Sequence, residues 1–153
     1  MALDETDKKL INLLQKDGKS TAKELSLLLN LSITAIYERI KKLEKKKIIK
    51  NYIAVIDKEK INLNFIVLIQ VKLIRHSHEF IEKFEKEVKQ FNEVLECYNI
   101  SGDYDYQLKI IVKNMKAYRE FLNKKLTMLN YIGSTYSTFI ISEVKNTNII
   151  QIA

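Results

Sequence analysis

Apolar residues in the first part of the chain are spaced as they are in short helices. The first helix is expected after Asp4, whose carboxylate can accept hydrogen bonds from the free amides at a helix start. Asp17-Gly18 ends it, because glycine accepts the left-handed geometry that a helix exit often needs. Between them, apolar side chains recur with helical spacing at Leu10, Ile11, Leu13 and Leu14.

Two further helices follow in the pattern. Ser20 can cap the first of them, and Thr21 with Glu24 offers a capping box as the alternative. Asn30-Leu31 makes the turn, and Ser32 caps the helix that follows. The expected apolar faces consist of Ala22, Leu25, Leu28 and Leu29 in one helix, and of Ile36, Ile40 and Leu43 in the next.

A pair of helices joined by a turn of about three or four residues is the pattern of a helix-turn-helix. In that motif the second helix enters the major groove of DNA, and its early residues meet base edges. Basic residues at its far end are expected at phosphates, and Tyr37 can face either the groove or the core. The DNA-side candidates are Ser32, Thr34, Ala35, Tyr37, Glu38, Arg39, Lys41, Lys42, Lys45 and Lys46.

After residue 50 the pattern changes to alternating strands and helices. Residues 51–57 are expected to form a strand, and 57–63 to hold the domain boundary. Further strands are expected over 64–74, 94–100, 106–112 and 132–144, helices over 77–91 and 115–129, and a short last strand over 148–153.

The order β-α-β-β-α-β predicts a ferredoxin-like domain, so the fold class is α+β. A helix-turn-helix (winged-helix-like) domain is expected over 1–50, a connecting strand and linker over 51–63, and the βαββαβ domain over 64–153. Two helices would cover one face of the sheet, and a second subunit would cover the other. The candidates for that second face are Val67, Ile69, Val71, Ile110 and Val112.

Charge strengthens the first half of this picture. The formal net charge is +7, and residues 1–60 hold 14 basic and 9 acidic residues. Only three basic residues of the chain are arginine, so a compositional bias toward Lys, Ile and Asn also explains part of the excess. Over Arg39–Lys50, however, seven basic residues face Glu44 alone. This clustering favours contact with a phosphate backbone.

Composition indicates where in the cell the protein is located and argues against catalytic, metal and cofactor sites. The apolar fraction of 46% is sufficient for a core, and no apolar run approaches the roughly 20 residues that span a membrane. The single Cys97 and a charged start without an apolar signal core predict a cytoplasmic protein. His76 and His78 lack a third metal ligand, Cys97 is expected to be buried, and no phosphate-binding Gly-rich loop is present. We therefore expect neither an enzyme nor a metal or cofactor site.

The turn between two expected strands is a candidate ligand site. Gly102 permits positive φ and close backbone approach, Asp103 and Asp105 can receive an ammonium, and turn amides can receive a carboxylate. An amino acid carries both groups, although Gly-Asp is also ordinary turn chemistry. Strand alternation predicts that two of the nearby hydroxyls share a face and the third points away. The effector candidates are Ser101, Gly102, Asp103, Tyr104, Asp105, Thr135, Ser137 and Thr138.

Several stretches together resemble the Lrp/AsnC family of transcriptional regulators (leucine-responsive, asparagine-responsive or feast/famine regulators). LDETDKKLINLLQKDGKSTAKELS resembles the family's start, and LSITAIYERIKKLEKKKII its recognition helix. ECYNISGDYDYQLKI resembles its most recognisable C-terminal segment, and MKAYREFLNKKL and ISEVK match the last helix and strand. Lys47 departs from the family, whose members usually carry glycine there.

The resemblance implies a DNA-binding transcriptional regulator that forms a homodimer through its C-terminal domains and often assembles to an octamer. It also implies a small effector, typically an amino acid, bound between dimers near the Gly-Asp-Tyr-Asp turn. As the residue that resembles a common family arginine, Arg39 has two interpretations: it reads DNA, or it pairs with an acidic residue and holds the domain. The alternative function is a nucleoid-type architectural protein that wraps DNA without an obligatory effector.

Overall fold

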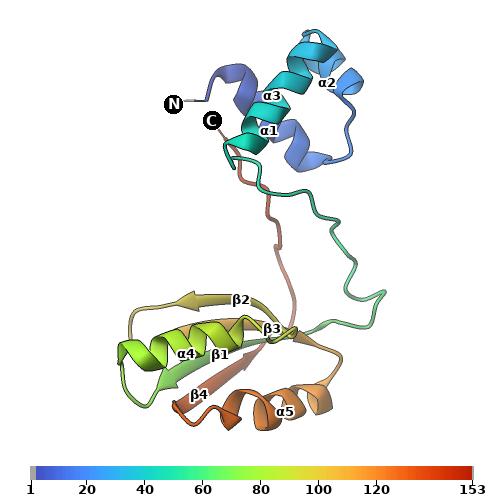
Figure 1. Cartoon of the computed structure of the whole chain (residues 1–153). Helices are drawn as coiled ribbons and strands as arrows, with labels where there is room; N and C mark the ends of the chain where they lie inside the picture. The colour runs from blue at the N-terminus through green and yellow to red at the C-terminus, as the bar shows by residue number, and fades with distance from the viewer. Residues whose placement is uncertain (1–2, 153) are drawn as a thin grey trace. The chain divides into compact units, whose positions relative to one another are not determined.

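In the computed structural model, which describes residues 3–152, the chain divides into two units. One contains residues up to 55 together with the segment from 145, and the other contains 56–144 (Figure 1). None of the described helices is long and apolar enough to cross a lipid bilayer.

The first unit is a three-helix domain. Its helices are α1 (Glu5–Lys16), α2 (Ala22–Leu29) and α3 (Ile33–Lys45). Their buried apolar residues form one cluster, which consists of Leu10, Ile11, Leu14, Leu25, Ile36 and Leu43. Because these positions recur every three or four residues, each helix turns one apolar face inward.

Most of the expected caps of these helices are present. Asp4 accepts from the backbone N–H of Asp7 at 2.7 Å, and Ser32 from that of Ala35 at 3.1 Å. Of the two alternatives for α2, the structure has the capping box of Thr21 and Glu24. These side chains satisfy amides that a helix start leaves without partners.

Three expectations about this unit were wrong. The first helix ends at Asp17-Gly18 as expected, but the left-handed geometry expected of Gly18 is wrong: its φ is not positive, and an added Cβ there would meet the Tyr52 ring at 3.3 Å. Leu28 is 66% exposed, because it points away from the face that buries Leu25. The stretch 51–57 forms no strand, since no other strand of the described chain pairs with it.

The second unit has the expected ferredoxin-like order. The strands are β1 (Phe65–Leu73), β2 (Val94–Asn99), β3 (Tyr106–Val112) and β4 (Ile132–Phe139), in the spatial order β2-β3-β1-β4 with antiparallel pairing throughout. The helices are α4 (His78–Val88), α5 (Met115–Lys124) and the short η1 (Leu126–Met128). The expected strand over 148–153 does not form in its described residues, and β4 ends earlier than expected.

The helices cover one face of this sheet. Phe84 and Val88 of α4 and Tyr118 and Phe121 of α5 pack in one cluster with alternate residues of β1 and β3. Those strand residues include Val67, Ile69, Val71, Ile110 and Val112. We expected these five residues on the uncovered face, and that was wrong: they form the core beneath the helices. The opposite face instead carries Gln70, Gln107, Lys109, Tyr98 and Tyr136, in the register of the strands.

Candidate nucleic-acid interface and effector turn

Helix α3 is anchored from one side and open on the other. Ile36 and Leu43 are 0% and 1% exposed within the cluster of the first unit. The left-handed Asn30 (φ 53°) ends α2, and three residues separate the two helices. The turn therefore has the length of a helix-turn-helix turn, and α3 stands in the place of its recognition helix.

The open side of α3 carries most of the DNA-side candidates. Thr34, Glu38, Lys41 and Lys45 follow one another at intervals of three or four residues, Tyr37 lies beside Glu38, and all five are exposed. Of the two positions left open for Tyr37, the structure shows the one outside the core, with 58% of the residue accessible. Ser32 and Lys46 are also exposed, whereas Ala35 and Lys42 are half-buried.

Arg39 lies on the boundary of that surface and is held by two carboxylates. Its Nη1 is 2.6 Å from an oxygen of Asp4 and 2.6 Å from an oxygen of Asp7. The side chain of Asp7 is 2% exposed, so the guanidinium neutralises a buried charge. The hydrogen bond from Arg39 also lowers the pKa of Asp4. Arg39 therefore links α3 to the start of α1, and a contact of Arg39 with DNA stays a prediction.

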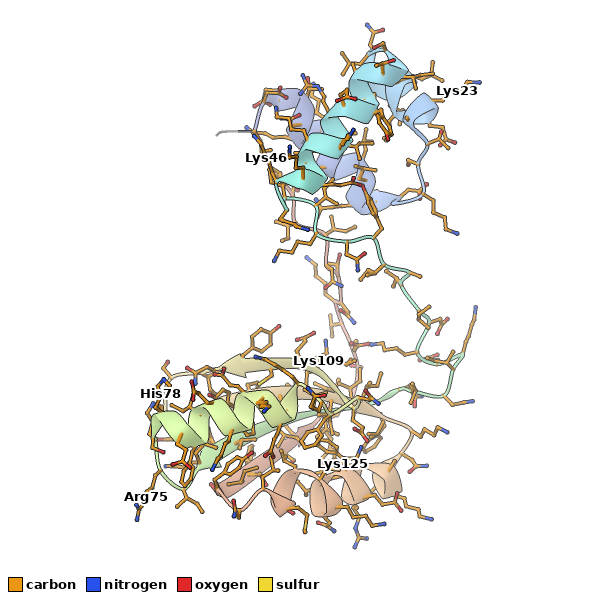
Figure 2. All side chains as sticks on the ribbon, viewed as in Figure 1. Lys23, Lys46, Arg75, His78, Lys109 and Lys125 are labelled. Atoms are coloured by element: carbon orange, nitrogen blue, oxygen red, sulfur yellow. The ribbon has the colours of Figure 1, made fainter. Side chains whose placement is uncertain are left out.

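The end of α3 is a surface of positive charge. Figure 2 shows Lys46 there, and Lys41, Lys42, Lys45 and Lys47 lie within the same stretch. These last four form no ion pair with the residues that the structure describes. Their charge is therefore available to an anionic partner.

The acidic residue of this stretch has its own partner. Glu44 accepts a hydrogen bond of 3.0 Å from the Tyr52 hydroxyl. Burial first, and this hydrogen bond second, raise the pKa of Tyr52 to about 12. Sequence analysis missed this contact, because Tyr52 was assigned to a strand.

Lys47 occupies a backbone conformation that glycine prefers. Its φ is 58°, in the left-handed region. The N–H of Lys47 donates to the Glu44 carbonyl at 2.9 Å, and that of Ile48 to the Leu43 carbonyl at 3.0 Å. These two bonds define a Schellman motif, in which the residue after the C-cap is left-handed. Glycine, which the resemblance implies at this position, would adopt this conformation without strain.

The candidate effector turn follows β2. Gly102 has φ 117°, in the region that L side chains rarely adopt, and an added Cβ would meet nothing within 4 Å. Ser101 and Asp103 are exposed and Tyr104 is half-buried. The ring of Tyr104 lies 6.4 Å from that of Tyr136 on β4. The turn and β4 therefore meet through these two rings.

The two aspartates of the turn differ. Asp105 accepts the backbone N–H of Leu73 at 2.7 Å with one oxygen, and its other oxygen lies 3.1 Å from His76 Nδ1. Its own N–H donates to the Val71 carbonyl at 2.9 Å. Asp105 thus fixes the turn to the end of β1. The side chain of Asp103, in contrast, forms no hydrogen bond or ion pair with the described residues.

The three hydroxyl candidates divide between the two faces of the sheet as expected. Thr135 and Ser137 pair with Val71 and Ile69, on the side of the helices, and Thr138 pairs with Leu68 on the other side. Ser137 Oγ accepts a hydrogen bond of 2.7 Å from the Tyr118 hydroxyl. The eight effector candidates therefore do not line a single cavity within this chain.

The two histidines and the cysteine, the remaining candidates for chemistry, lie in sites that do not suggest catalysis or metal binding. His76 contacts Asp105, and His78 faces Glu82 at 3.4 Å. Cys97 was expected to be buried, and this was wrong: the residue is exposed because β2 is an edge strand. Its thiol is still partly shielded from solvent, and this shielding raises the pKa of the thiol. Within residues 3–152, no group of three or more His, Cys, Asp or Glu side chains is placed to hold a metal ion.

Comparison with known proteins agrees with both units. A model described as winged helix-turn-helix DNA-binding matches residues 3–50, and one described as Lrp/AsnC ligand binding domain matches residues 66–150. The chain is 36% identical over 147 residues to a leucine-responsive regulatory protein from Haemophilus influenzae, covering 96% of this chain and 89% of that protein. The corresponding protein of Klebsiella pneumoniae is 35% identical over 146 residues, covering 95% and 89%.

Solved structures give the same result. A transcriptional regulator from Neisseria meningitidis, in a complex with L-Met, superposes with a TM-score of 0.93 at 32% identity, covering 97% of this chain and 96% of that one. An AsnC family transcriptional regulator from Agrobacterium tumefaciens has a TM-score of 0.92 at 30% identity, with coverage of 97% and 96%.

A helix-turn-helix unit joined to a ligand-binding ferredoxin-like unit defines a DNA-binding transcriptional regulator, not an enzyme. The chain belongs to the Lrp/AsnC family of such regulators.

Proposed function

We propose that this regulator binds DNA through the open face of α3 and the lysines at its end, and that an amino acid controls it from the second unit. The observation that carries the proposal is the charge of Lys41, Lys42, Lys45 and Lys47 at the end of α3, beside a row of exposed polar side chains. None of these lysines forms an ion pair with a residue that the structure describes. Such an arrangement suits base contacts early in the helix and phosphate contacts at its end.

The division of roles follows from exposure. Thr34 is exposed near the start of α3, where a groove-bound helix meets base edges, and it is our main candidate for sequence reading. The lysines contact phosphates and contribute affinity for any sequence. Arg39, bound to two carboxylates, positions α3 first and reaches DNA only as a second role.

The test of this surface is a double charge reversal, Lys42→Glu with Lys45→Glu, in a DNA-binding titration at several salt concentrations. Each lost phosphate contact reduces the slope of log K against log salt by about 0.9, so two contacts reduce it by about 1.8. The matched control reverses Lys116 and Lys124, which are exposed on α5 of the second unit. Equal loss of affinity in both variants, or none in the first, would refute the assignment.

We further propose that the effector is an amino acid bound at the Gly102–Asp105 turn. Asp103, exposed and without a bonded partner among the described residues, receives the ammonium, and Asp105 positions the turn. The L-Met complex of the Neisseria meningitidis regulator supports an amino acid as the ligand class. Because the candidates lie on two faces of the sheet, we place the complete site between subunits, where a second copy adds the missing wall.

This part is tested by isothermal titration calorimetry with a panel of amino acids that includes L-methionine and L-leucine. Wild-type protein should bind at least one of them, and Asp103→Asn should weaken that binding at least tenfold. Asp57→Asn, an equal change on an exposed loop of the same unit, should leave binding unchanged. No heat with any amino acid, or equal binding by Asp103→Asn, would count against the site.

Assembly completes the proposal. No helix of the described chain covers the sheet face opposite α4 and α5, and Tyr98 and Tyr136 on that face are 54% and 58% exposed. We propose that a second copy covers it, giving a homodimer that assembles further to an octamer in the cytoplasm. Native mass spectrometry with and without the bound amino acid reports the assembly; a monomer under both conditions would refute it.

A further inference from the structure

The last described residues of the chain bind to α1. Gln15 Nε2 donates to the Ile150 carbonyl at 2.8 Å, and the Ile150 N–H donates back to Gln15 Oε1 at 2.8 Å. Asn12 repeats the arrangement with Ile152: its Nδ2 donates to the Ile152 carbonyl at 3.0 Å, and its Oδ1 accepts the Ile152 N–H at 3.2 Å. Four hydrogen bonds thus join two side-chain amides to the backbone N–H and C=O groups of two residues.

The pattern resembles the pairing of two β-strands, except that side-chain amides on a helix take the place of the backbone groups of the second strand. In an extended chain, the N–H and C=O of residues i and i+2 point to the same side, about 6.7 Å apart. Residues i and i+3 of a helix lie on one face, separated by a rise of about 4.5 Å. The amides of Asn12 and Gln15 have enough reach to span the difference, so each acts in place of the peptide group of a neighbouring strand.

Apolar packing adds to these bonds. Ile152 is partly buried against the core cluster of the three-helix unit, whereas Ile150 is 73% exposed. The segment therefore packs against the unit at Ile152, while its hydrogen bonds to Gln15 hold it at Ile150. Its partners lie on α1, so docking leaves the open face of α3 uncovered.

We propose that Asn12 and Gln15 form a docking site for the chain's own C-terminal segment, residues 149–152, which ties the DNA-binding unit to the effector unit by a second connection. The first connection is the stretch that follows Lys50, and the second is the stretch of nine residues, 140–148, that leaves β4. β4 carries the hydroxyl candidates of the effector site, so a change there reaches α1 through those nine residues. This consequence rests on the proposed function; the docking itself does not.

Amide hydrogen exchange of the full-length protein tests the docking without DNA or effector. The amides of Ile150 and Ile152 should exchange at least about tenfold more slowly than those of residues 145–148, which no strand or helix contains. Asn12→Ala with Gln15→Ala should abolish that difference. Lys9→Ala with Lys16→Ala, an equally helix-favouring change on exposed positions of α1, should preserve it.

A second variant covers the case in which the double alanine variant fails to fold. Ile150→Pro removes a donor from the segment and leaves α1 intact, so it should lose the protection of Ile152 while α1 to α3 stay protected. Exchange of Ile150 and Ile152 at the rate of residues 145–148 in the wild type would overturn the proposal. Unchanged protection of Ile152 in Ile150→Pro would do the same.

The identity of the docked segment is tested by a disulfide between Gln15→Cys and Ile150→Cys in a Cys97→Ser background. An intrachain product, which runs as a monomer on a denaturing gel, supports docking of the chain's own segment. A product of twice the mass would show that a second copy supplies the segment and would overturn this part of the proposal.

The regulatory consequence has a separate readout. In a DNA-binding titration, Asn12→Ala with Gln15→Ala should bind DNA within about threefold of wild type and respond at least tenfold less to the amino acid that the wild type binds. A full response would overturn the coupling. If the wild type itself bound neither DNA nor an amino acid, the proposed function would fail while the exchange result still stood.

Discussion

Replacement of Lys47 by glycine should stabilise the DNA-binding unit. Lys47 is left-handed at the exit of α3, with φ 58° and both hydrogen bonds of a Schellman motif. A residue with a Cβ is strained there, because the Cβ approaches the following carbonyl oxygen. Glycine meets no such penalty and can keep the same two hydrogen bonds.

The expected gain follows from two opposing terms. The left-handed conformation costs a residue with a Cβ about 1–2 kcal/mol. Glycine itself lowers the free energy of unfolding by about 0.5–1 kcal/mol, because it loses more backbone entropy on folding than a residue with a Cβ does. The net gain is therefore about 0.7 kcal/mol, which corresponds to roughly threefold slower opening of the unit.

Amide exchange of α1 and α3 in the full-length protein measures this opening directly. The matched control is Lys45→Gly, which removes the same charge from an exposed position within α3. There glycine costs about 1 kcal/mol, so exchange should become roughly fivefold faster. The two variants change the charge equally, and only the backbone conformation of the site separates them.

The sign of the difference decides the matter. Exchange that is faster in Lys47→Gly than in the wild type would show that the left-handed geometry is not strained, or that the lysine side chain stabilises the exit. Equal acceleration in Lys47→Gly and Lys45→Gly would refute the conformational explanation altogether.

Three further predictions concern other positions. Thr21→Ala should destabilise the three-helix unit by about 1 kcal/mol and Ser20→Ala by much less, as seen in the exchange of α2, because Thr21 makes the capping box; equal effects would contradict this. The pKa of Asp4 is lowered, so the stability that its carboxylate contributes is present above the ordinary pKa of 3.8 and disappears as the pH falls through the folded pKa. Asp4→Asn should therefore reduce the loss of helix signal at acid pH in a far-ultraviolet circular dichroism titration, and an unchanged pH profile would contradict this prediction. Gly102→Ala should cost about 1–2 kcal/mol in the second unit through φ 117° alone, since space for a Cβ exists, and unchanged denaturant unfolding would argue against that strain.

Much of this fold follows from local signals in the sequence. Caps such as Asp4 and Ser32 and the apolar spacing of α3 place the helices, because each signal acts within one turn. The order of strands and helices likewise predicts the ferredoxin-like unit.

Other features depend on partners that are distant in sequence. Alternation along β1 could not show on which face of the sheet Val67, Ile69 and Val71 lie, since it separates two faces without showing which one the helices cover. The bonds of Asn12 and Gln15 to the C-terminal segment join residues 135 to 140 positions apart, and no local pattern announces them.

The candidate site shows the same division. Exposure of Thr34 and Lys45 follows from the buried stripe of α3 by helical geometry. The anchoring of Arg39 by Asp4 and Asp7 depends on packing of α1 against α3, so the sequence left both roles of Arg39 open. The difference between Asp103 and Asp105 likewise arises from the end of β1, which is remote in the chain.

The central claim, sequence-specific regulation under amino-acid control, is tested most directly by footprinting on the DNA upstream of the protein's own coding region, with and without the amino acid found by calorimetry. The account predicts discrete protected half-sites about one helical turn apart, whose occupancy or extent changes when the amino acid is added. Uniform coverage that no amino acid alters would contradict it and would favour an architectural DNA-binding protein.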